Sequence, residues 1–200
     1  MTRIFRFSAA DFKAMPWKNG NGLTTELIIE PPCASLTGGF DWRLSMAVVK
    51  ESGPFSCLMG VDRTILILEG NGMELNHGVH GKSFLTSPLI PVTFNGDWDT
   101  FGSLLSGPCV DFNVMTDRTK VRHNVLVVRP KLESVFLPKV QTVLVFCVKG
   151  NAYLTDTKEA IISGELLRID LQSSDIDIEL RTTDQSTVLV VVSITSTKVA

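Results

Sequence analysis

Short runs of β-forming residues, separated by glycine, proline and asparagine, fill almost all of this 200-residue chain. Strands are expected where Val, Ile, Thr and aromatic residues gather between such turn residues. No window holds a convincing run of apolar residues at helical spacing, and Ser8 with Asp11 can cap only a single helical turn. The sequence therefore predicts an all-β chain. The expected strands cover residues 2–7, 23–30, 40–50, 62–69, 72–76, 83–94 in two pieces, 99–106, 109–116, 121–128, 133–137, 141–149, 151–155, 164–171, 175–181 and 187–195.

The second half of the chain repeats the pattern of the first at an offset of 80 residues. Residues 65–72 (ILILEGNG) align with residues 145–152 (VFCVKGNA), and residues 110–114 align with residues 190–194. A strand, a Gly-Asn turn, a second strand and a closing apolar strand recur in both halves. Two similar β-sandwich lobes are the economical explanation of this repeat.

Charged residues are concentrated in the first copy of the repeat. Arg63 aligns with Val143, and Asp111 aligns with Val191. If the lobes share a shape, the first encloses a polar cavity, whereas the second is filled or packs against its twin. The alternative is that the first-half side chains simply face solvent, as on many half-buried sheets. We predict an N-terminal lobe, residues 1–118, that carries the pocket, and a structural C-terminal lobe, residues 119–200.

Residues 15–30, MPWKNGNGLTTELIIE, supply a rim for such a pocket. The run Asn-Gly-Asn-Gly at 19–22 tolerates positive φ and predicts a tight turn. In the strand that follows, Thr24 and Glu26 share one face, because side chains alternate. The other face is expected to carry Leu23, Thr25, Leu27 and Ile29. An ordinary hairpin turn with polar decoration is the alternative.

Polar side chains on four strands are expected to converge. Thr24 and Glu26 share a face, as do Arg43 and Ser45, and as do Asp111, Asn113 and Met115, while Arg63 opens a fourth strand. These groups form either a buried ion-pair network that fixes geometry or a ligand site. In the second case the cations hold a carboxylate, and the Asp, Asn and Glu side chains accept the ligand's donors. Arginine suits this task because its planar fork matches a carboxylate.

Composition and charge argue against several classes of partner. The net charge of −2 gives no electrostatic footprint for nucleic acid or an anionic membrane. The longest apolar runs, such as residues 188–192, are too short to span a bilayer, and the first residues lack a signal-peptide core. The four cysteines are scattered without CxxC spacing. We therefore expect a soluble, cytoplasmic protein with no nucleic-acid or membrane partner.

Metal and covalent chemistry find little support in the sequence. Of three histidines, His77 and His80 lie in the loop NHGVHG, and the His-x-His pair with a following Glu that metal-dependent β-barrels use is absent. No Gly-x-Ser-x-Gly motif is present, and no cysteine has an activating histidine beside it. We assign no metal, no cofactor and no catalytic residue. General acid–base work by Glu26 or Asp111 stays open, because burial would raise the pKa of either carboxyl.

The segments PWKNGNGLTTE, DWRLS, GPFS, DRTILILEGNGMEL, FNGDW and GPCVDFNVMT, in this order, resemble the HutD/Ves family of bacterial cupin-like proteins. The resemblance covers about residues 15–115, and the second half matches in length and strand pattern only. It implies a bicupin: an all-β fold of two tandem cupin-like, jelly-roll lobes. It also implies a link to histidine utilisation through binding of a formylated or formiminated glutamate, with no established enzymatic activity.

The resemblance carries over a set of pocket residues by position. Two departures from the family pattern stand out: Asn21 replaces the middle one of three glycines, and Asp117, followed by Arg118, stands where the family usually has Arg. The implied ligand-binding residues are Trp17, Lys18, Asn19, Thr24, Glu26, Arg43, Ser45, Arg63, Asp111, Asn113 and Met115.

Three hypotheses about function follow. The first is a metal-free sensor or regulatory protein of histidine or amino-acid catabolism that binds a small carboxylate metabolite. The second is an isomerase or hydrolase that uses Glu26 or Asp111, and the third is a structural or assembly role. The sequence leaves the oligomeric state open, with a homodimer as one option. Three pocket cations against two carboxylates leave one positive charge for an acidic ligand.

Overall fold

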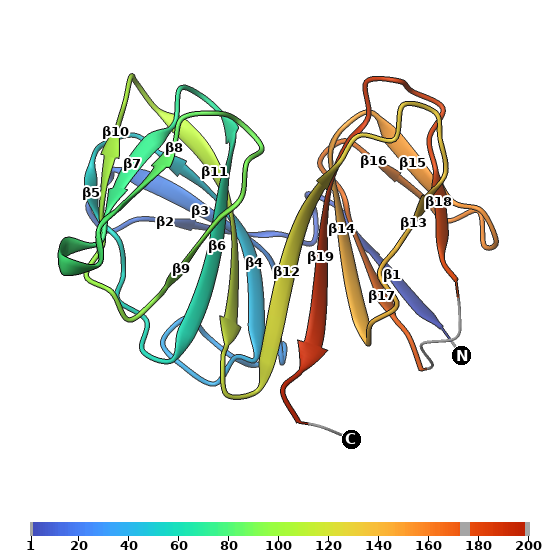
Figure 1. Cartoon of the computed structure of the whole chain (residues 1–200), viewed down its shortest axis with the longest axis horizontal. Helices are drawn as coiled ribbons and strands as arrows, with labels where there is room; N and C mark the ends of the chain where they lie inside the picture. Colours follow the sequence, from blue (N-terminus) through green and yellow to red (C-terminus); the bar gives the residue numbers. More distant parts are fainter. Residues whose placement is uncertain (1, 173–176, 199–200) are drawn as a thin grey trace. The chain divides into compact units, whose positions relative to one another are not determined.

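The computed structural model describes residues 2–172 and 177–198. Within these residues the chain is built from β-strands and one 3-10 turn, η1 (Gly78–His80), with no α-helix (Figure 1). The all-β prediction is confirmed. Ser8 and Asp11 form a hydrogen-bonded turn, in which the Ser8 amide donates to Asp11 Oδ2 at 2.8 Å. No helix in the described part of the chain is long and apolar enough to cross a membrane.

Each expected strand has an observed counterpart, although the start of the expected strand 175–181 lies outside the described residues. Three short strands, β2, β5 and β16, were not expected. The observed strands are β1 (Arg3–Phe7), β2 (Lys13–Pro16), β3 (Gly22–Glu30), β4 (Trp42–Val49), β5 (Gly53–Pro54), β6 (Val61–Glu69), β7 (Met73–Asn76), β8 (Lys82–Leu85), β9 (Val92–Asn95), β10 (Phe101–Leu104), β11 (Cys109–Asp117), β12 (Val121–Val128), β13 (Val135–Phe136), β14 (Thr142–Lys149), β15 (Asn151–Leu154), β16 (Ala160–Ile162), β17 (Leu166–Asp170), β18 (Glu179–Arg181) and β19 (Val188–Ser196).

The chain divides into two compact units. One is the continuous segment 12–122, and the other joins the residues up to 11 to those from 123 onward. This division differs from the expected lobes 1–118 and 119–200, because β1 pairs antiparallel with β17. Ile4 lies opposite Ile169 in that pairing and packs against the apolar core of the second unit. Burial of its apolar side chains therefore makes β1 part of the second unit rather than of the 12–122 unit that follows it in the sequence.

Strand order repeats between the two units, as the sequence repeat predicts. In the 12–122 unit the order β4-β11-β6-β9 forms part of a six-stranded sheet, with β3 and then β2 beside β4, and β5-β10-β7-β8 forms a second sheet. In the other unit the order β12-β19-β14-β17 continues to β1, and β13-β18-β15-β16 forms the second sheet. Each strand of the first series corresponds to the strand about 80 residues later. Each unit is a two-sheet antiparallel sandwich.

The two sandwiches differ in what fills them. Val143 and Val191, which align with Arg63 and Asp111, belong to the continuous apolar core of the second unit. In the 12–122 unit an apolar core that includes Ile65, Ile67, Met73, Leu75 and Leu85 occupies only part of the space between the sheets.

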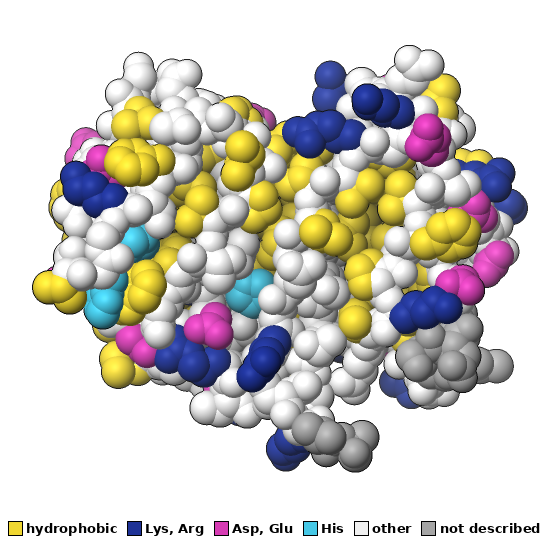
Figure 2. Space-filling model, viewed as in Figure 1, with side chains coloured by type: hydrophobic (Ala, Val, Ile, Leu, Met, Phe, Trp, Pro, Cys, Tyr) yellow, Lys and Arg dark blue, Asp and Glu magenta, His cyan; other side chains and the backbone are white. Residues whose placement is uncertain are grey.

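The surface carries mixed charge, as the small net charge predicts. On the face shown in Figure 2, both acidic and basic side chains are present on each unit, and Lys and Arg side chains gather at the upper end of the unit on the right.

Candidate functional site

A cavity of about 640 Å³ lies inside the 12–122 unit. It is lined by strands of the six-stranded sheet and by Phe55, Met73, Gly102 and Leu104 on the side of the four-stranded sheet. The cavity is therefore the part of the sandwich interior that the apolar core leaves open.

Strand register arranges the inward side chains of the six-stranded sheet in rows, because residues directly opposite on antiparallel strands share a face. Arg43 lies opposite Met115, and Met115 lies opposite Arg63. Three further rows follow toward the other end of the strands. In order, the four rows are Arg43–Met115–Arg63, Glu26–Ser45–Asn113, Thr24–Ala47–Asp111 and Gly22–Val49–Cys109.

Arg43 is the largest fully buried polar side chain of this unit. Its Nε donates to Glu26 Oε2 at 2.7 Å, and its Nη1 donates to Ser45 Oγ at 3.1 Å. Nη1 also lies 4.0 Å from the sulfur of Met115. Nη2 is buried and has no hydrogen-bond partner. The buried charge is thus balanced by Glu26, while one donor stays free.

A β-bulge in β3 turns part of that strand over. The register shifts between Glu26 and Ile28, so that Glu26 lies opposite Ser45 but Ile29 lies opposite Arg43. Thr24 and Glu26 share a face, as predicted. The expectation that Ile29 lies on the face opposite to theirs is wrong, because the extra residue in the bulge breaks the alternation. Ile29 packs with Met115 in a small apolar cluster.

Arg63 lies between two aromatic rings, with its guanidinium carbon 5.1 Å from the ring centres of both Phe55 and Phe94. Its Nη1 donates to the Ser56 carbonyl at 3.4 Å, and its buried Nε has no partner. No carboxylate in the described residues forms an ion pair with it. Burial lowers the pKa of Arg63 to about 10; Asp111 opposes this shift, and Arg43 adds to it. Arg63 remains a cation at neutral pH.

Asp111 and Asn113 complete the polar wall. Asp111 Oδ1 and Asn113 Oδ1 are buried without a hydrogen-bond partner. Burial raises the pKa of Asp111 to about 7, against the opposing pull of Arg63. With Arg43 Nη2 and Arg63 Nε, they make four unpartnered polar atoms around one cavity. Such groups cost free energy unless a partner satisfies them.

The turn after β2 forms the rim of the cavity. Trp17 Nε1 donates to Thr24 Oγ1 at 2.8 Å, which fixes the indole on the wall. Gly22 is needed for this packing, because a Cβ there would meet Trp17 Cε3 at 2.7 Å and the Val48 carbonyl at 2.6 Å. Lys18 and Asn19 are exposed at the rim. Asn21 has no positive φ, so a side chain at this position adds no backbone strain.

Ten of the eleven predicted site residues line the cavity. The other, Glu26, is not part of the lining and acts through Arg43. Sequence reasoning missed the wall formed by Phe55, Ser56 and Leu58, and the apolar end formed by Val49, Met73 and Leu104. The segment GPFS, residues 53–56, is one of those that resemble the family, but its composition does not indicate that the Phe55 ring packs on Arg63.

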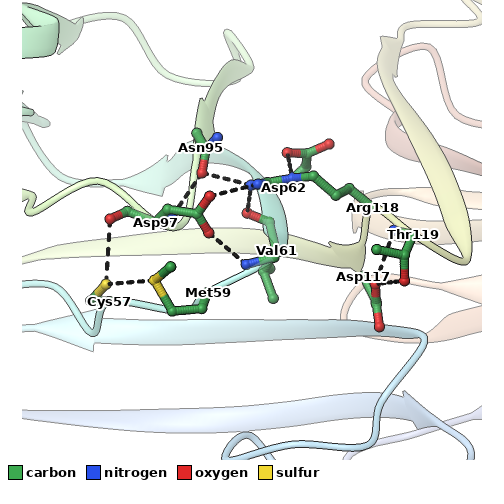
Figure 3. Close-up of polar contacts among 10 residues, drawn as sticks. Cys57, Met59, Val61, Asp62, Asn95, Asp97, Asp117, Arg118 and Thr119 are labelled. Atoms are coloured by element: carbon green, nitrogen blue, oxygen red, sulfur yellow. Dashed lines mark hydrogen bonds and ion pairs between the residues drawn. The ribbon is translucent and has the colours of Figure 1, made fainter.

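Arg118 helps to fix the loop of residues 57–60, whose Leu58 lines the cavity (Figure 3). Its Nη1 donates to Asp97 Oδ2 at 2.6 Å, and its Nε donates to Asp62 Oδ1 at 2.9 Å. Asp97 Oδ1 in turn accepts the Gly60 amide at 2.5 Å. Asp117 accepts from Thr119 in a local turn and does not line the cavity. The departure from the family pattern at 117 and 118 therefore lies outside the lining.

In the described part of the chain, the histidines and carboxylates are not grouped as metal ligands. His77 is buried, with its ring nitrogens 2.9 Å from Thr100 Oγ1 and 3.1 Å from Ser83 Oγ. His80 stacks on Trp98. Among the described residues no three His, Cys, Asp or Glu side chains are grouped to hold a metal ion. The described cavity lining contains no histidine, and its two carboxylates, Glu51 and Asp111, are accompanied by two arginines, so it does not fit the metal-binding pattern of metal-dependent β-barrels.

Residues 9–190 match the HutD family. The chain belongs to the HutD family. HutD from Pseudomonas fluorescens SBW25 is 30% identical in sequence, with a TM-score of 0.82, and the match covers 98% of this chain and all of that one. An oxalate decarboxylase from Lactobacillus farciminis, 10% identical with a TM-score of 0.64, shares the fold alone. These neighbours confirm the cupin-like β-sandwich fold.

Two curated relatives match part of the chain. An uncharacterised 21.2 kDa protein from the hutC 3′ region of Pseudomonas putida is 38% identical over 118 residues, and Protein Ves of Citrobacter koseri is 36% identical over 121 residues. Each match covers 58% of this chain and about three-fifths of the relative, 59% and 61% respectively.

Proposed function

We propose that the cavity of the 12–122 unit binds a small carboxylate metabolite, and that the protein acts without a metal as a cytoplasmic sensor or regulatory protein of histidine or amino-acid catabolism. The observation that carries this proposal is the set of four buried, unpartnered polar atoms on Arg43, Arg63, Asp111 and Asn113. Two are cationic donors and two are acceptors, all facing one cavity. A ligand that pairs with them relieves their desolvation cost.

The charges of the wall favour an anion with one negative charge at the site. Glu26 balances Arg43 through a direct ion pair. Arg63 has no such pair, and the raised pKa of Asp111 makes that carboxyl a weak counter-ion near pH 7. A ligand carboxylate supplies the missing charge, and arginine holds carboxylates well.

The second row, Glu26–Ser45–Asn113, favours a ligand that also carries an amide. Ser45 and Asn113 lie opposite each other between the row of the two arginines and the row of Asp111. A hydroxyl and a side-chain amide can both donate to and accept from an amide group. A formylglutamate-like molecule carries both a carboxylate and such a group, which agrees with what the family resemblance implies.

The pathway rests on the relatives. The Pseudomonas putida protein takes its name from the hutC 3′ region, and the solved Pseudomonas fluorescens relative is named HutD. Four free cysteines, two of them exposed, suit a reducing compartment.

The test is calorimetric titration of N-formyl-L-glutamate and L-glutamate into the wild-type protein and Arg43→Ala. The variant removes one cation and strands Glu26, so binding should fall below detection, since breaking a desolvated charge pair costs ~2–5 kcal/mol. Lys82→Ala is the control. Lys82 is the first residue of β8; it is half exposed and paired with Glu74 outside the cavity. If no acid binds, or if Arg43→Ala binds as well as wild type, the proposal is wrong. Ligand-induced thermal stabilisation separates it from a purely structural role.

A second candidate function, an isomerase or hydrolase, is favoured by one observation. A carboxyl with a pKa of about 7 can give or take a proton near neutral pH, and Asp111 has such a pKa. Glu26 suits this role less, because its carboxylate is engaged by Arg43. Conversion of bound acids should be followed by NMR, with Asp111→Asn as the variant that keeps a polar side chain and loses the proton transfer. No conversion by wild type, with binding retained, eliminates this candidate.

A further inference from the structure

The cavity changes character along its length. On β4, the inward side chains run Arg43, Ser45, Ala47 and Val49, from charged to polar to apolar. The four-stranded sheet follows the same trend at the apolar end, where Leu104 lies opposite Met73. The arginines thus occupy one end of the cavity, and aliphatic side chains, edged by Glu51 and Ser52, occupy the other.

The cavity is long as well as graded. Arg43 and Val49 are six residues apart on one strand, which places their Cα atoms about 20 Å apart at about 3.3 Å per residue. The volume of about 640 Å³ is in the range of sites for drug-sized molecules, about 300–1,000 Å³. A formylated amino acid, only a few bonds long, leaves the apolar end unfilled.

Apolar side chains at this end of the cavity are only partly covered by the rest of the protein. Trp17, Ala47 and Leu104 are partly buried hydrophobic residues that pack against the core while lining the cavity. Gly102 also lines the cavity, and its lack of a side chain lets the Phe55 ring pack closely on it, because a Cβ there would meet that ring at 2.5 Å. Apolar surface that lines a cavity gains free energy when an apolar group covers it.

We propose that this pocket takes acids whose amide carries an acyl chain longer than formyl, with the chain lying along Ala47, Val49, Met73 and Leu104. The carboxylate lies toward the arginines, and the amide lies at the row of Ser45 and Asn113. This inference rests on the proposed carboxylate binding and names the ligand class as N-acylated acids.

The experiment is calorimetric titration of wild type with N-formyl-, N-acetyl-, N-butanoyl- and N-hexanoyl-L-glutamate. Affinity should rise about threefold to fourfold for each methylene that becomes buried, the increment typical of apolar burial. Ala47→Leu places a larger side chain in the cavity, so the ratio of hexanoyl-compound affinity to formyl-compound affinity should fall at least tenfold. Leu104→Asn should flatten the dependence on chain length without adding bulk.

Matched controls separate these effects from loss of folding. Ala14→Leu makes the same substitution at an exposed position on β2, and Leu105→Asn makes it beside Leu104; neither residue lines the cavity. Both should behave as wild type. If the formyl compound binds and longer chains bind no better, this inference is wrong and the proposed function stands. If no acid of any length binds, both are wrong.

Discussion

Nε of Arg43 lies 2.7 Å from Oε2 of Glu26, and this ion pair joins β4 to β3 beside the bulge of β3. The arginine side chain is 1% exposed and the glutamate side chain 15% exposed. The bulge brings Ile29 opposite Arg43, so the glutamate reaches its partner diagonally across the strand pair. The pair therefore fixes both the guanidinium and the register on its side of the site.

Glu26→Gln should lower the free energy of unfolding by about 2–3 kcal/mol, because it leaves the buried guanidinium without a counter-charge. Urea denaturation measures the change. Glu74→Gln is the matched control: its partner Lys82 is half exposed, so the loss should be below about 1 kcal/mol. Adding Arg43→Met to Glu26→Gln should recover part of the loss. Equal losses for Glu26→Gln and Glu74→Gln would contradict the buried pair.

The raised pKa of Asp111 should make stability depend on pH. The folded pKa is about 7 and the ordinary value is 3.8. Between these values the folded state holds a proton that the unfolded state releases, so the free energy of unfolding falls as pH rises from about 4 to 7 and levels off above. Asp111→Asn lacks this contribution. Urea denaturation at pH 5, 6, 7 and 8 gives the free energy of unfolding of each protein. The value for wild type minus the value for the variant should decrease up to pH 7 and then stay constant. A difference independent of pH would contradict the burial of this carboxyl.

Asp97→Asn should loosen the loop of residues 57–60. Asp97, in the turn after β9, accepts both from the Gly60 amide and from Arg118, so neutralising it weakens the attachment of the loop to that turn. Amide hydrogen exchange at residues 58–60 should become at least tenfold faster. Asp62→Asn is the control, because Asp62 binds Arg118 without contacting the loop amide. Comparable acceleration in both variants would show that Arg118 alone, rather than Asp97, restrains the loop.

Gly22→Ala should destabilise the protein by about 1–3 kcal/mol, because the new methyl group overlaps the Trp17 ring and the Val48 carbonyl. Tryptophan fluorescence should change as the indole moves off the wall. Gly53→Ala, where a Cβ meets nothing within 4 Å, should change stability little. Unchanged fluorescence in Gly22→Ala would mean that Trp17 packs elsewhere.

Sequence reasoning reached the fold because the strands alternate and repeat. Thr24 and Glu26 share a face for the same reason. The bulge at residue 27 has no marker in LTTELIIE, so the placement of Ile29 could not be predicted. The row of Arg43, Met115 and Arg63 depends on the register between strands far apart in the sequence. The wall at Phe55 belongs to a short strand and loop whose position depends on the second sheet. The identity of the site residues could therefore be predicted from the sequence, but their arrangement in space could not.

Because β1 pairs with β17, the strands cannot all pair in the order in which they are synthesised. Residues 3–7 are synthesised long before their partner strand, Leu166–Asp170. The segment 12–122 is continuous and contains all of its own strand partners up to β11, so it can fold while the rest is translated. Strand β1 stays unpaired until β17 has been made. A gene cut between β11 and β12 would thus yield one piece with an unpaired β1 and another in which β17 lacks its partner β1.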